Sequence, residues 1–218
     1  SAGHVGTLAA FTVDAASSQS GAVTITGVSA GGNLTVSMGA GTGALTMNSS
    51  VTTGNFTVDA SSFGGAIDIS TVTGSGAATI SVGSSGDFSA NQVAVQGAFT
   101  LDAAAATTGS ITLAGITAGG NLTIAMGQGT GSIVLTSAIT AGNFTLDGTT
   151  FGGAIDIANV TASGAVVVST GSAGDLSATQ IHTTGSVTVD GAAASTGAVT
   201  LNTVSASGAV TISMGSGS

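Results

Sequence analysis

One thirteen-residue stretch occurs twice in this chain, 88 residues apart. GGNLTVSMGAGTG spans residues 31–43 and GGNLTIAMGQGTG spans residues 119–131, and ten of the thirteen positions are identical. The same spacing relates Asp14, Asp102 and Asp190. A fixed repeat period is typical of folds in which one structural unit stacks on the next. The 218 residues hold two full units, 1–88 and 89–176, and a partial third, 177–218.

Each 88-residue unit divides again into four shorter repeats. Aliphatic residues within similar short stretches stand at positions 13, 36, 58, 80 and 101, in steps of 23, 22, 22 and 21 that then recur. Two more short segments follow each of these stretches, and all of them alternate apolar with polar residues. Strict alternation of this kind predicts β-strands.

Three short strands in about 22 residues, separated by turns rich in Gly, Ser and Ala, predict one coil of a parallel β-solenoid, also called a β-helix. We therefore expect an all-β protein in which residues 1–218 form a single continuous solenoid of about ten coils. An antiparallel sandwich would not need the same residue types to recur in column after column. Because the sequence starts and stops within the repeat pattern, we expect it to be a window of a longer chain.

The repeat assigns most residues to columns. One buried column is expected to contain Phe11, Leu34, Phe56, Ala78, Phe99, Leu122 and Phe144, and an outward column of Thr runs beside it, interrupted only by Val167. The next outward column alternates Asp with Ser or Ala, so its carboxylates are expected about 9.6 Å apart, twice the strand spacing of ~4.8 Å. Phe63 and Phe151 lie in turns and are expected to cover the core at one corner.

Composition excludes several classes of function. The chain has no Lys or Arg and a net charge of −9, which argues against a nucleic-acid partner, since that binding depends on cations that neutralise phosphate. The apolar residues form no run of about 20, so we expect no membrane span. With 42% hydrophobic residues and a mean hydropathy of +0.60, the chain has enough apolar surface to fold.

Catalysis is not expected. The chain lacks Cys, Lys and Glu, and its two histidines, His4 and His182, interrupt the repeat. His182 replaces Ala94 in an outward column, which favours a tolerated surface substitution. We therefore predict that the protein is not an enzyme and has no organic cofactor.

Calcium binding is left open, because Ca²⁺ takes six to eight oxygen ligands and the chain is acidic. Asp68, Asp87, Asp156 and Asp175 are weak candidate ligands. The Gly-Gly-x-Gly-x-Asp turn of calcium-binding repeats is absent, which favours solvated single carboxylates.

Six Asn-x-Ser/Thr sequons could carry glycans in a secreted protein. They lie at Asn33, Asn48, Asn55, Asn121, Asn143 and Asn159. Asn33 and Asn55 begin strands of adjacent coils, as do Asn121 and Asn143. Stacked amides at such positions can hydrogen-bond along the solenoid axis, and we favour this structural role.

The stretches GNLTVSMGAGTGALTM and GNFTVDASSFGGAIDIS resemble the β-strand repeat regions of large bacterial secreted surface proteins, including S-layer-like, adhesin-like and extracellular-fibre proteins. The resemblance implies an extracellular or cell-surface location and transfers no functional residue. It implies a structural or adhesive role. Because both ends of the sequence continue the coil pattern without a polar cap, we expect the repeat to be part of the shaft of an extracellular filament, fibre or surface layer. Such a shaft would be extended by further coils of the same chain, which we favour, or by self-association of copies into a filament or sheet.

Two alternatives remain. One is the stalk of an adhesin whose binding domain lies outside this sequence, with cell-surface glycans as partners. The other is an ice-binding solenoid. A flat ice-binding face resembles aligned rows of Thr-x-Thr, whereas the corresponding strand of this chain has Thr-x-Asp or Thr-x-Ser.

Overall fold

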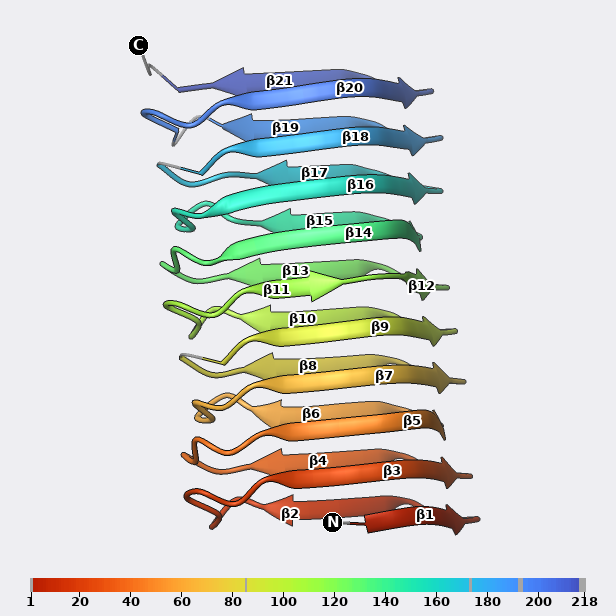
Figure 1. Ribbon diagram of the computed structural model, residues 1–218. Helices are drawn as coiled ribbons and strands as arrows, with labels where there is room; N and C mark the ends of the chain where they lie inside the picture. Colours follow the sequence, from red (N-terminus) through yellow and green to blue (C-terminus); the bar gives the residue numbers. More distant parts are fainter. Residues whose placement is uncertain (1, 85, 173, 192–193, 216–218) are drawn as a thin grey trace.

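The computed structural model describes residues 2–84, 86–172, 174–191 and 194–215, which form stacked coils without any helix (Figure 1). In each coil a long strand leads through a tight turn into a short strand, and a longer loop leads into the next coil. Every strand pair is parallel. The predicted all-β parallel solenoid is therefore confirmed.

The strands form two sheets, each with ten levels along the stack. The long-strand sheet contains β1 (Ala2–Thr7), β3 (Val23–Ala30), β5 (Leu45–Thr53), β7 (Ile67–Gly74), β9 (Phe88–Val95), β11 (Ile111–Leu113), β12 (Ile116–Ala118), β14 (Ser132–Ala141), β16 (Ala154–Ala162), β18 (Leu176–Thr183) and β20 (Val199–Ala206). The short-strand sheet contains β2 (Phe11–Ala15), β4 (Leu34–Met38), β6 (Phe56–Ala60), β8 (Ala78–Val82), β10 (Phe99–Ala103), β13 (Leu122–Met126), β15 (Phe144–Asp147), β17 (Val166–Ser169), β19 (Val187–Gly191) and β21 (Val210–Met214).

Strand register confirms the repeat period. Phe11 pairs with Leu34, Leu34 with Phe56, Phe56 with Ala78, and Ala78 with Phe99, which are the predicted steps of 23, 22, 22 and 21 residues. The predicted buried column thus stacks as expected. Each member from Leu34 to Phe144 is at most 1% exposed.

The second and third predicted segments of a coil run on as one strand in most coils, so the three segments occupy two sheets. Within the described ranges they separate where β11 ends and β12 begins, around Ala114 and Gly115. Elsewhere the inward-outward alternation breaks at this point while strand pairing continues. In β5 the register shifts between Met47 and Ser50, and in β14 between Leu135 and Ala138.

At each of these two register shifts the long strand contains one extra residue, and the tight turn that follows it is one residue shorter. Val51 precedes Phe56 by five residues, whereas Val28 precedes Leu34 by six. The tight turn after β5 is correspondingly short, at residues 54–55, and the turn after β14 repeats this at residues 142–143. The short strands consequently remain in register along the whole stack.

Phe63 and Phe151 fold from the longer loops into the core, as predicted, and are at most 1% exposed. Space for each ring comes from a nearby glycine. A Cβ atom on Gly65 would lie 2.6 Å from the Phe63 ring, and one on Gly153 would lie 2.7 Å from the Phe151 ring. No glycine in the described ranges has a positive φ. The loops therefore use glycine to allow close approach instead of left-handed backbone.

Three threonines are buried, and one of them differs from the others. Thr53 and Thr183 donate their hydroxyl groups to the carbonyl oxygens of Gly32 and Gly164 in the coil before. Thr170 is fully buried, and its Oγ1 has no hydrogen-bond partner among the described residues. Val82 occupies the equivalent position of the first unit. Thr170 is thus a polar side chain in an apolar column.

Placing a carboxylate at a buried column position should unfold the stack locally. We expect Ile69→Asp or Leu113→Asp to lower the free energy of unfolding by more than about 4 kcal/mol, because each side chain is fully buried and a charge there has no partner. Thr73→Asp, at an exposed position, should change it by less than about 0.5 kcal/mol. Urea denaturation followed by circular dichroism measures both, and equal tolerance at the two kinds of position would refute the inside-outside assignment.

Removing the buried hydroxyl of Thr170 should stabilise the protein. We expect Thr170→Val to raise the free energy of unfolding by about 1 kcal/mol or more, because an unsatisfied buried hydroxyl is lost without leaving a cavity. The reverse change, Val82→Thr, should lower it by a similar amount at the equivalent level of the first unit. Thermal unfolding of both variants tests this; a destabilised Thr170→Val protein would mean that the hydroxyl has a partner.

Candidate assembly surfaces

Both ends of the described stack are apolar. Strands β20 and β21 are the last in their sheets and have a neighbour on one side only. Val210, Ile212 and Met214 are 49–50% exposed, while their counterparts Leu34 and Val36 are fully buried. At the opposite end, β1 and β2 are likewise paired on one side only, and Phe11 is half-buried. Each end thus offers a strand edge and an open core to another coil.

The short-strand sheet carries the predicted outward columns. Asp14 pairs with Ser37, Ser37 with Asp59, and Asp59 with Ser81, and this alternation continues along the sheet to Ser213. Thr residues pair with Thr in the adjacent column except at Val167. The carboxylates therefore recur in every second coil, as expected.

The carboxylates of this column also shape the loops, which the sequence reading did not foresee. The Oδ1 atom of Asp14 accepts a hydrogen bond from the N–H of Ala16, that of Asp59 from Ser61, and that of Asp102 from Ala104, at 3.0–3.3 Å. Asp147 does the same with Thr149. An Asp that accepts from the backbone two residues on initiates a turn. In the sequence, this turn-forming role is indicated by the small and polar residues that directly follow each Asp.

The four candidate calcium ligands lie apart from one another. Asp87 accepts from the N–H of Ser110 and Asp175 from that of Ala198, each at 2.8 Å and each in the following coil. Asp68 accepts from the Ser89 hydroxyl at 2.8 Å, and Asp156 is exposed in β16. In the described ranges no three His or Asp side chains gather where they could hold one metal ion. Calcium binding stays an untested alternative to the favoured reading of solvated single carboxylates.

The Asn pairs form the predicted ladder. Asn55 donates its side-chain amide to Oδ1 of Asn33 at 3.1 Å, and Oδ1 of Asn55 accepts from the N–H of Ala77 at 2.8 Å. Asn143 donates likewise to Asn121 at 2.8 Å, and it accepts from Ala165 at 2.7 Å. The amides thus connect three successive coils in each unit.

The two remaining sequon residues lie on long strands, with Asn48 exposed in β5 and Asn159 half-buried in β16. Glycosylation at the six sequons stays an untested alternative.

Charge is confined to one edge of the solenoid. Every Asp lies in one of the longer loops or within three residues of one, so the nine carboxylates gather at the loop edge, on the left in Figure 1. We call this the acidic edge. No Asp lies within three residues of any tight turn. We call the tight turns and the adjoining strand ends the neutral edge.

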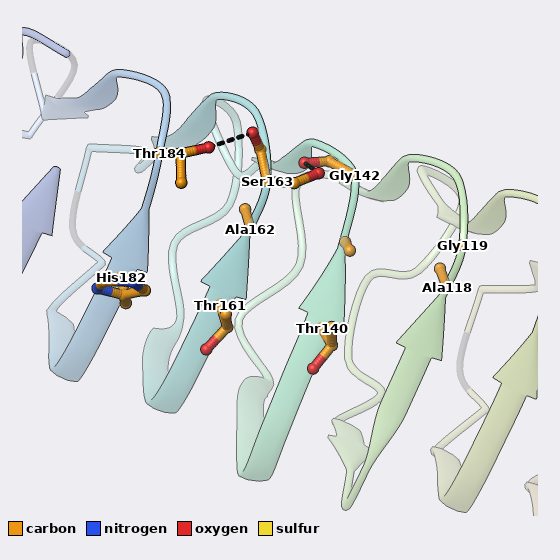
Figure 2. A pocket seen from close by; sticks show the side chains of 10 residues that line it. Ala118, Gly119, Thr140, Gly142, Thr161, Ala162, Ser163, His182 and Thr184 are labelled. Atoms are coloured by element: carbon orange, nitrogen blue, oxygen red, sulfur yellow. Dashed lines mark hydrogen bonds between the residues drawn. The ribbon is translucent and has the colours of Figure 1, made fainter. Parts of the chain in front are cut away.

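A shallow recess of about 400 Å³ runs along the neutral edge between β12 and β18. Figure 2 shows Thr140, Thr161 and His182 projecting side by side from β14, β16 and β18. All three side chains are exposed, which agrees with the predicted outward column of His182. Beside them, the Thr184 hydroxyl donates to the carbonyl oxygen of Ser163 at 2.6 Å.

Comparison with known proteins found no matching family model, no matching curated protein and no matching solved structure. None of the described segments is a helix that could cross a membrane.

The Asn ladder should contribute to stability. We expect Asn143→Ala to lower the free energy of unfolding by about 1–2 kcal/mol, because it leaves the half-buried N–H of Ala165 without its acceptor. Asn48→Ala removes the same side chain from an exposed strand position and should cost less than about 0.5 kcal/mol. Chemical denaturation compares the two, and equal losses would show that the ladder adds nothing specific.

Proposed function

We propose that this chain is a structural repeat that forms the shaft of an extracellular filament, fibre or surface layer. The observation that carries the proposal is that the stack repeats its surface as well as its core. The Asp, Ser and Thr columns keep one register from coil to coil. A surface that repeats in this way suits contacts that recur along a long object.

The two ends of the described stack are compatible with the same proposal, whether the next coil belongs to the same chain or to a second copy. A coil placed on β20 and β21 would cover Val210, Ile212 and Met214 and pair the free strand edges, as each inner coil does for its neighbour. Column chemistry is compatible with such stacking. Ser213 ends the alternating column at one end and Asp14 begins it at the other, and a Met beside an Ala already occurs where Ala103 pairs with Met126.

An extracellular location is part of the proposal. It is supported by the resemblance of the quoted repeats to those of secreted surface proteins. It is also supported by composition, since a chain without Lys or Arg offers trypsin no cleavage site and one without Cys is indifferent to redox conditions.

A polypeptide of residues 1–218 should assemble end to end through these faces. We expect fibres in electron micrographs of the concentrated protein, and we expect Ile212→Asp to prevent them, because a carboxylate would then be buried in every junction. Thr211→Asp adds the same charge to the same strand on its outward side and should still form fibres.

Circular dichroism of both variants shows whether the solenoid itself is intact, since position 212 is half-exposed in the single chain. Folded wild-type protein that stays monomeric at high concentration would contradict the assembly proposal, as would fibres formed equally by both variants.

A further inference from the structure

The separation of charge between the two edges has a consequence for lateral contacts. The nine carboxylates belong to the acidic edge, and the chain has no Lys or Arg to neutralise them. A contact between two acidic edges would bring like charges together, and a buried carboxylate there would have no cation as partner. For lateral contacts, the neutral edge is a surface where two copies can meet without either penalty.

We propose that two solenoids pair side by side through their neutral edges, so that the partner of this surface is a second copy of the chain. The contact is isologous, with the same edge contributed by both copies. The acidic edges then face outward and remain solvated. This inference deepens the proposed function, on which it rests, by turning a single shaft into a double one.

The dimensions favour this arrangement. The carboxylates nearest the neutral edge, such as that of Asp59, lie four residues from a tight turn, and four residues of strand span about 13 Å. In a pair joined at the neutral edges, the two sets of carboxylates are therefore at least twice that distance apart. Charges separated by more than the Debye length of ~8 Å at physiological salt are largely screened. Pairing through the neutral edges thus brings almost no repulsion.

The chemistry of the neutral edge suits close packing. Its turns contain Gly119 and Gly142, which leave the backbone accessible, and the adjoining recess presents the hydroxyl and methyl groups of Thr140 and Thr161. Both Thr side chains are exposed and can donate and accept hydrogen bonds across a contact. No Asp lines the recess, so a second copy can enter it without desolvating a carboxylate.

The competing arrangement packs a neutral edge against an acidic edge, and it predicts a lateral assembly of a different size. It would desolvate carboxylates on one side and leave a further free edge on each copy, so it would grow into an open sheet. The isologous contact uses both neutral edges and stops at two. The size of the lateral assembly therefore distinguishes the two arrangements.

The test uses the 218-residue chain carrying Ile212→Asp, in which end-to-end growth is blocked. Sedimentation velocity should show a species of twice the 20.0 kDa chain mass. Adding Thr140→Asp places carboxylates in the middle of the contact and should weaken the dimer at least tenfold. Adding Thr112→Asp changes net charge equally, but it continues the two-coil spacing of Asp68 and Asp156 near the acidic edge, and it should leave the dimer unchanged.

A second measurement avoids any effect of added charge on folding. Because the chain has no Cys, a spin label can be attached to Thr140→Cys alone or to Thr112→Cys alone. We expect strong dipolar coupling between copies for the label at position 140 and much weaker coupling for the label at position 112, which lies farther from the neutral edge. A monomeric end-blocked protein, a dimer unaffected by Thr140→Asp, or coupling only at position 112 would overturn the pairing. Failure of wild-type fibres, with the dimer intact, would instead count against end-to-end assembly alone.

Discussion

Each coil of this protein is positioned by backbone hydrogen bonds to the coil before and the coil after. The backbone N–H of Phe11 donates to the backbone carbonyl oxygen of Asn33 at 2.8 Å. In the same way Leu34 donates to Asn55 and Phe56 to Ala77, each at 2.9 Å, and the series continues along the stack. Because side chains alternate sides along a strand, a slip of one residue would turn a buried column outward. The number of residues in a coil is therefore tightly constrained. In the coils of β5 and β14, one extra residue in the long strand is offset by a tight turn that is one residue shorter, so the next short strand stays in register.

The abundance of small residues follows from the same stacking. Where the chain turns, neighbouring coils lie so close that a side chain on many glycines would meet the backbone of the coil below; a Cβ on Gly41, for example, would lie 2.6 Å from the carbonyl oxygen of Ser18. Bulk is concentrated in the columns, where Phe alternates with smaller residues and fills the space between the sheets. Gly-rich loops and a well-packed core are thus two results of one geometry.

Much of the fold could be predicted from the sequence because every structural column is also a sequence column. The apolar residues Phe56 and Val58 alternate with the polar Thr57, which predicts that the first two face the core and the third faces outward. The equivalent residues of the other coils show the same alternation. The joining of two segments into one bent strand was not predictable, because it depends on whether pairing continues through residues such as Ser49 and Ser50, where alternation fails. Thr170 could not be recognised as buried without a partner, since its neighbours in space come from other coils.

The candidate surfaces were predicted less completely. The Asn ladder and the spacing of Asp14 and Asp59 follow directly from the repeat. The turn-forming role of these carboxylates depends on the backbone orientation of loop residues such as Ala16 and Ser61. The collection of all nine carboxylates at one edge depends on which loops share a side of the stack. That property belongs to the three-dimensional arrangement of the coils and has no counterpart in local composition.

The strictly neighbour-to-neighbour hydrogen bonding also determines how the protein would respond to a pulling force. Tension between its two ends loads the outermost coil first, because an inner coil is held by neighbours on both sides. A released coil of about 22 residues adds some 70 Å of extended chain at ~3.3 Å per residue. The molecule would therefore lengthen in regular steps while the remaining coils stay folded. A shaft built in this way can yield under load, coil by coil, without losing its whole structure at once.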